Sequence, residues 1–186
     1  GDFEGDPGQV NMGAGTVLPD NTYDDNPSGV YYFHIRARNT NLVWGDPARF
    51  KVRVDRDPPT DPFNLKTTSH PQAIGQYDCD QSPNNVVDVS WNILPGGSYR
   101  ASTDGHSGLL GYSFVWDHSP GTIPDATIEA GYSVFYTQSA ALANDTTWYF
   151  HVRAVDRAAD TPNASGAVHI GPFYIDVPPP DMPAGF

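Results

Sequence analysis

Acidic residues gather at two places where they could together bind a hard metal ion. Asp55, Asp57 and Asp61 line one proline-rich segment, and Asp156 and Asp160 follow the most regular apolar stretch of the chain. Carboxylate oxygens are the ligands that Ca²⁺ prefers. The favoured interpretation is that these acids form turns and protect sheet edges, so no metal site or cofactor is assigned. Calcium bound at a domain junction is the alternative hypothesis.

The histidines show no spacing that predicts a metal site. His34 and His151 occupy the same place in two related segments, each close to an arginine, and we expect both on the solvent side of half-buried strands. A titrating pH switch is the alternative role for such a pair. The other four are scattered and match no zinc-binding motif: His70, His106, His118 and His169.

No catalytic motif stands out in the chain. A serine nucleophile of the G-x-S-x-G type is absent, and the 22 acidic residues form no distinctive pair for glycoside cleavage. The single cysteine, Cys79, lies between two aspartates that disfavour the thiolate, and it has no second cysteine for an internal disulfide. We therefore expect a protein that is not an enzyme.

Charge limits the classes of partner. The formal net charge is −12, with 22 acidic against 10 basic residues, which disfavours nucleic acid and anionic membrane as partners. No apolar run reaches the length of a membrane span and no signal peptide is present. The 18 Gly and 18 Pro residues interrupt the chain often and favour many short elements.

One stretch, residues 147–156, defines the elements that must position these side chains. Apolar residues at alternate positions, from Trp148 through Phe150 and Val152 to Ala154, predict a strand with one buried face. Residues 29–39 repeat the pattern, and Phe33 precedes Phe150 by 117 positions. A strand that returns at domain spacing indicates a tandem array.

Proline-rich segments mark the limits of the units. Residues 57–62 and 176–183 are extended, semi-rigid linkers that bracket a unit of roughly 120 residues. Before the first linker, residues 29–39 and 48–55 predict an antiparallel hairpin. Between the linkers we expect seven strands, at 63–68, 85–91, 109–117, 127–128, 133–137, 147–156 and 168–176. Seven short strands in such a length predict an all-β, two-sheet sandwich.

The seven-strand unit resembles a fibronectin type III domain of large bacterial surface and secreted proteins. The resemblance lies in residues 87–91, 107–117, 148–156 and 171–176, and covers residues 57–176. It implies tandem immunoglobulin-like sandwiches, one complete and one partial. The family's sixth-strand aromatic, often Tyr, is Tyr31 in the first copy and Trp148 in the second, so a tyrosine corner is in doubt for the second. The expected core comprises Trp91, Tyr112, Phe114, Trp116, Trp148, Phe150 and Val152.

The domain organisation follows from the repeat. Residues 1–56 are expected to be the C-terminal half of one such domain, 57–176 a complete domain, and 177–186 a linker that opens a further repeat. The first copy then lacks three strands, and these lie either upstream of residue 1 or in another subunit. A fragment of a longer array is the first alternative, and assembly through shared strands is the second.

The predicted function is mechanical. We expect a non-catalytic structural or adhesive repeat module of an extracellular or cell-surface protein, with neighbouring repeats, copies of itself, a surface glycan or another protein as partners. A fibre or filament subunit is one form of this function. The alternative is an accessory, carbohydrate-binding linker region of a secreted hydrolase, in which Tyr32, Trp44 and Tyr149 stack on sugar rings. Fold alone does not choose between them.

Overall fold

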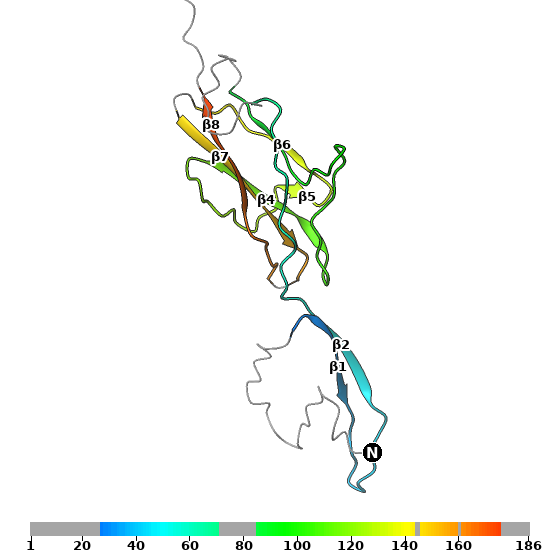
Figure 1. Cartoon of the computed structure of the whole chain (residues 1–186). Helices are drawn as coiled ribbons and strands as arrows, with labels where there is room; N and C mark the ends of the chain where they lie inside the picture. Colours follow the sequence, from blue (N-terminus) through cyan, green and yellow to red (C-terminus); the bar gives the residue numbers. More distant parts are fainter. Residues whose placement is uncertain (1–26, 71–84, 144–145, 160, 176–186) are drawn as a thin grey trace, which may run out of the picture.

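The protein is all-β, as the sequence predicts. The computed structural model describes residues 27–70, 85–143, 146–159 and 161–175, and in these ranges it contains strands and no helix (Figure 1). The strands are β1 (Gly29–Ile35), β2 (Ala48–Val54), β3 (Asp88–Ser90), β4 (Leu109–Asp117), β5 (Ala130–Gly131), β6 (Tyr136–Gln138), β7 (Thr146–Asp156) and β8 (Val168–Ile175). Every strand pair is antiparallel.

Strands β1 and β2 form a two-stranded hairpin that extends away from the other strands (Figure 1). The register pairs Phe33 with Phe50 and Tyr32 with Lys51. The connecting loop is closed by Asn39, whose side-chain oxygen accepts a hydrogen bond from the Val43 amide at 2.9 Å. The predicted hairpin at 29–39 and 48–55 is therefore confirmed, with a shorter first strand.

The remaining strands form two layers, which we call the sandwich unit. One layer pairs β3 with β6, and the other has the order β5-β4-β7-β8. Residue Lys66 bridges to Ser90 and adds a short third strand segment to the first layer. Antiparallel layers with a shared apolar interior are consistent with a β-sandwich.

The core lies between these layers and is built from aromatic rings. Of the seven expected core residues, Trp91, Tyr112, Phe150 and Val152 are fully buried. The other three pack partly buried against them: Phe114, Trp116 and Trp148. The Tyr112 hydroxyl accepts hydrogen bonds from the Asn92 side chain at 2.7 Å and the Ser102 amide at 3.0 Å, which satisfies its polar end inside the core. Burial raises the pKa of Tyr112, and the bonds from Ser102 and Asn92 act against it.

Four of the predicted strands differ from those observed, and local turns explain three of the differences. The strand expected at 85–91 is shorter, because β3 covers only Asp88–Ser90. Residues 63–68 form only one bridge, because Asn64 has a φ of 47° and interrupts the ladder. Residues 127–128 form no strand, since the Thr127 amide bonds to the side chain of Asp125 in a turn. The strand expected at 133–137 starts later, at β6, because the Val134 amide bonds back to the Gly131 carbonyl.

Candidate functional site

The junction between the hairpin and the sandwich unit is tied by Asp55. One carboxylate oxygen accepts the Ser107 amide at 2.7 Å, and the other accepts the Asp57 amide at 3.2 Å. The Asp55 carbonyl also accepts a hydrogen bond from the Asn163 side chain at 3.3 Å. Burial would raise the pKa of Asp55, but the hydrogen bonds from Ser107 and Asp57 and the nearby His106 outweigh it and lower that pKa. The end of β2 is thus held by two loops of the sandwich unit.

Asp156, the last residue of β7, is fully buried beside Asp55. Its Oδ1 accepts the amides of Ala158 at 3.0 Å and Asn163 at 2.8 Å, and its Oδ2 accepts the Asn163 side chain at 2.7 Å. The Asn163 side chain therefore bridges the linker and the end of β7. Asp55 and Asp156 both belong to the acids considered under the alternative calcium hypothesis, and the structure brings them together.

Asp104 completes a cluster of three carboxylates. Its Oδ2 accepts the amides of His106 at 3.1 Å and Gly108 at 2.6 Å, whereas its Oδ1 is buried and has no hydrogen-bond partner. Oxygen atoms of Asp55, Asp104 and Asp156 all lie within 4.8 Å of one another. Three negative charges at this spacing repel, and a cation placed among them would relieve that repulsion.

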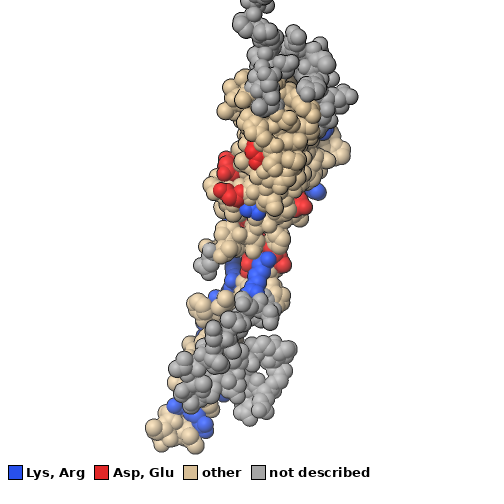
Figure 2. Space-filling view, turned by 90° about the vertical axis from the view of Figure 1, so that its left-hand side faces the viewer, with Lys and Arg blue, Asp and Glu red and all other residues tan. Residues whose placement is uncertain are grey.

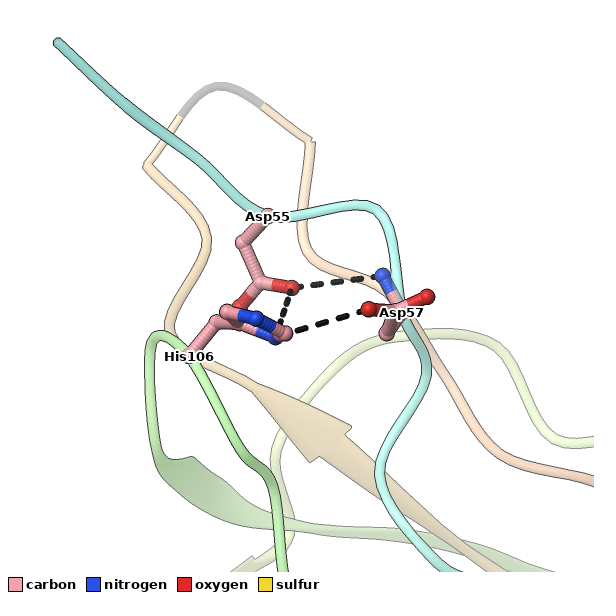
Figure 3. A group of neighbouring side chains, drawn as sticks. All are labelled: Asp55, Asp57 and His106. Carbon is pink, nitrogen blue, oxygen red and sulfur yellow. Dashed lines mark hydrogen bonds and ion pairs between the residues drawn. The ribbon is translucent and has the colours of Figure 1, made fainter. Parts of the chain in front are cut away.

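A second group at the same junction contains an imidazole (Figure 3). His106 Nδ1 lies 3.4 Å from Asp57 Oδ2 and 4.0 Å from Asp55 Oδ1. The Asp57 side chain is 63% exposed. The group has the geometry of a surface ion pair when His106 is protonated, and such pairs contribute little to stability.

Sequence reasoning missed Asp104 and His106, and included residues that do not belong. Asp61 lies against Gly166, where an added Cβ would be 3.0 Å from its carboxylate, and it is not one of the clustered ligands. Asp160 lies outside the described residues. The position of Asp104 could have indicated its place in the cluster. It stands in the loop before β4, and loops at one end of a sandwich converge.

The donor set of the three-aspartate cluster fits a hard cation. Its ligand atoms are carboxylate oxygens, which suit Ca²⁺ or Mg²⁺ better than Zn²⁺. The unpartnered Oδ1 of Asp104 is the atom that a bound ion would satisfy. The residues present therefore fit the calcium hypothesis.

His151 does not lie on the solvent side as the alternation predicts, and this expectation is wrong. It is fully buried, with Nε2 3.1 Å from Asp117 Oδ1 and Nδ1 2.5 Å from His169 Nδ1. The segment after β4 accounts for the burial, because its Asp125 carbonyl accepts a hydrogen bond from Arg153 at 3.2 Å on the same side of β7. His34 is exposed as expected.

His118 and His70 pack against aromatic rings of the sandwich unit. His118 Nδ1 lies 2.7 Å from the Thr147 carbonyl oxygen, and the imidazole sits 4.0 Å from the Trp148 ring. His70 is buried edge-on to Phe173, with ring centroids 6.2 Å apart. Neither belongs to a metal-binding group among the described residues.

The aromatics that were candidates for sugar stacking have different environments. Tyr32 is 57% exposed. Trp44 is half exposed, but the guanidinium groups of Arg36 and Arg38 lie 4.5 and 5.2 Å from its ring centroid. Tyr149 is half-buried and stacks on His151. Cys79 lies outside the described residues.

Comparisons with known proteins identify no relative: no protein-family model and no curated protein matches this chain. Within its described ranges, the chain has no helix with the length and apolar character needed to span a membrane.

Proposed function

We propose that this chain is a non-catalytic structural or adhesive repeat module of an extracellular or cell-surface protein, built as a tandem array of fibronectin type III-like sandwiches. The observation that carries the proposal is a pair of similar hydrogen bonds, in which aromatic side chains at equivalent positions donate to backbone carbonyls four and five residues earlier. The Tyr31 hydroxyl donates to the Pro27 carbonyl at 2.7 Å, and the Trp148 indole donates to the Ala143 carbonyl at 3.3 Å. Tyr31 and Trp148 are 117 positions apart, and in this fold family the aromatic at that corner bonds back to the backbone.

The strand registers support the same relation. His34 pairs with Arg49 in the hairpin, and His151 pairs with His169 in the sandwich unit. The first members of these pairs are again 117 positions apart. We therefore propose that β1 and β2 are the last two strands of a domain whose complement lies upstream or in another copy. Residues 57–176 are the complete domain, and 177–186 a linker to a further repeat.

We further propose that Ca²⁺ stiffens the junction through Asp55, Asp104 and Asp156. A mechanical module gains from a fixed angle between successive units, and here the linker, the loop before β4 and the end of β7 each supply one carboxylate. An ion bound only by the folded protein stabilises it by mass action. Its contribution rises with the logarithm of the free calcium concentration.

Calorimetry with and without calcium tests the junction site. For the wild type we expect Tm to rise with millimolar Ca²⁺, and for Asp104→Asn we expect this rise to be lost. Asp46→Asn is the matched control, because it makes the same charge change at an exposed position outside the cluster. A calcium response that is unchanged in Asp104→Asn, or absent from the wild type, contradicts the proposed site.

Electron microscopy of the full-length native protein tests the mechanical role. We expect extended particles, as beaded rods or filaments. A compact particle in which this chain packs against a catalytic domain would contradict the role and favour an accessory region of a hydrolase.

The glycan-binding alternative is supported by the exposure of Tyr32, which lines a surface hollow with His34, Arg49 and Lys51. A glycan array tests it. Under this alternative, Tyr32→Ala abolishes binding and Tyr149→Ala, at a half-buried ring, does not.

A further inference from the structure

The outer face of the hairpin carries a row of cations, which we call the basic ladder. It comprises Arg49, Lys51 and Arg53, at alternate positions of β2 and all exposed. Alternate residues of a strand lie on one face about 7 Å apart. Arg49 and Lys51 line the same hollow as Tyr32 and His34 from β1.

No acidic residue of the described ranges pairs with the cations of the basic ladder. Among the described residues none of the three forms an ion pair or a side-chain hydrogen bond. The surrounding segment is unusually basic: residues 27–56 contain six of the 10 Lys and Arg residues and only two of the 22 Asp and Glu residues. A protein with a net charge of −12 therefore presents one local cationic surface.

The basic ladder is not a general property of the repeat. The strand registers place His169 at the position equivalent to Arg49, and Tyr174 at the position equivalent to Arg53. The ladder is also not needed for packing, because the apolar residues Phe33, Phe50 and Val52 lie on the opposite face. A feature that neither the fold nor the repeat requires indicates a recognition surface.

The complementary surface belongs to the sandwich unit. Residues 57–176 contain 13 acidic residues against four basic ones. Asp125 and Glu129 are exposed beside β5, and Figure 2 shows Asp and Glu side chains on the flank of the sandwich unit. The hairpin and the sandwich unit lie end to end, so the basic ladder faces away from the described acids of its own sandwich unit (Figure 1).

We propose that the basic ladder docks on the acidic flank of the sandwich unit of a second copy of this chain. The contact is head-to-tail, since two different surfaces meet, and such contacts propagate into open arrays unless they close into a ring. The inference rests on the proposed structural function and deepens it, because it names a second copy of the chain as the partner. Its strength depends on salt, since both surfaces are exposed.

Sedimentation equilibrium of the chain at two ionic strengths tests the inference. Between about 0.01 M and about 1 M salt the Debye length falls from roughly 30 Å to roughly 3 Å. We expect self-association at low salt, and the 20.2 kDa monomer at high salt. A chain that is monomeric at low salt overturns the docking inference but not the proposed function, which fails only if the native protein is not extended.

Charge reversal provides the specific test. We expect Arg49→Glu/Lys51→Glu to weaken self-association by about tenfold or more, because like charges then face each other. Lys66→Glu/Arg100→Glu is the matched control, with the same charge change on the sandwich unit, and it should associate at least as well as the wild type. Equal effects of the two double variants would show that net charge alone acts, and would overturn the inference.

A rescue experiment identifies the acidic surface and separates it from other anions. The variant Asp125→Lys/Glu129→Lys should bind Arg49→Glu/Lys51→Glu in a mixture, although neither associates alone. Circular dichroism of each variant verifies folding. Failure of the mixture to associate, together with wild-type binding to heparin that the ladder variant loses, would assign the ladder to an acidic polysaccharide and overturn docking to a second copy.

Discussion

The two hairpins of this chain share a sequence pattern but differ in environment. In β7–β8, Phe150 is 0% exposed and lies among the rings of Trp91, Phe114 and Trp116, with centroid distances of 6.0, 5.6 and 4.8 Å. In β1–β2, the equivalent Phe33 is 40% exposed and its partner Phe50 is 67% exposed.

The difference shows that the hairpin sequence itself determines strand pairing, whereas burial of the apolar face requires other strands. Both hairpins are antiparallel, and each has an aromatic side chain that donates to a nearby backbone carbonyl, because these features depend on residues close in sequence. They differ in register, since β7–β8 has an irregularity between Trp148 and Phe150 that β1–β2 lacks. Burial depends on a second layer, and among the described residues only β7–β8 has one. A two-stranded hairpin with an uncovered apolar face is marginal in water.

The largest effect that tests this contrast comes from removing the two phenylalanine rings. Phe150→Ala should lower the free energy of unfolding by about 3–5 kcal/mol, because it leaves a cavity in an aromatic core. Phe33→Ala should cost about 1 kcal/mol or less in the isolated chain, since its side chain is already 40% exposed and no second layer covers it among the described residues. Urea unfolding followed by tryptophan fluorescence measures both values.

A large loss of stability for Phe33→Ala would contradict the contrast. It would mean that a second layer covers the first hairpin in solution. Repeating the measurement across protein concentrations shows whether this layer comes from another copy of the chain, because the stability of such an assembly rises with concentration.

The equivalent histidines provide a second, smaller contrast. His151→Ala should lower the free energy of unfolding by about 1–3 kcal/mol, because it deprives Asp117 and His169 of a partner inside the covered face of the sheet. His34→Ala, on the exposed hairpin, should change it by less than about 0.5 kcal/mol. Urea midpoints at neutral pH measure both, and similar values for the two variants would contradict the contrast.

The smallest effect is a pH dependence carried by His169. Burial lowers the pKa of His169, the nearby His151 lowers it further, and Asp117 acts in the opposite direction. The folded state therefore favours neutral His169, and stability should decline as the pH falls below the unfolded value of about 6.5. Urea midpoints between about pH 7.5 and about pH 5.5 should fall in the wild type and less in His169→Asn.

Asp88 loses its stabilising effect at a lower pH than His169, so the two contributions can be measured separately. Burial would raise the pKa of Asp88, but hydrogen bonds from Ser69 and Thr68 outweigh it and lower the pKa. Its contribution is present above the unfolded value of about 3.9 and is lost only at lower pH. If the His169→Asn variant loses stability as steeply as the wild type between about pH 7.5 and about pH 5.5, His169 is not the responsible group.

The sequence predicts the strands of this protein better than it predicts the site. Alternation along β7 identifies Phe150 and Val152 as core residues, because a strand with one buried face has a period of two. The same rule fails at His151, since alternation shows which residues share a face and not whether another segment covers it. The local turn at Asn64 was likewise invisible in an apolar pattern.

The three-aspartate cluster shows how far sequence alone can lead. Asp55 and Asp156 were considered under the alternative calcium hypothesis because they stand at the first proline-rich junction and at the loop between the last two strands. Asp104 lies in an irregular loop, and nothing in its spacing relates it to residues 49 positions before it or 52 positions after it. Only the folding of three chain segments to one end of the sandwich unit brings these carboxylates together.

Asn163 gives the junction a chemical vulnerability. Its amide nitrogen donates to both the linker and the end of β7, and it is also the atom that a glycan would occupy in the sequence Asn163-Ala164-Ser165. Hydrolysis of this amide would replace the donor with a second carboxylate facing Asp156. Both hydrogen bonds of the side-chain nitrogen, to Asp55 and to Asp156, would then be lost. The stiffness of the connection between β2 and the sandwich unit would then decline as this side-chain amide is lost.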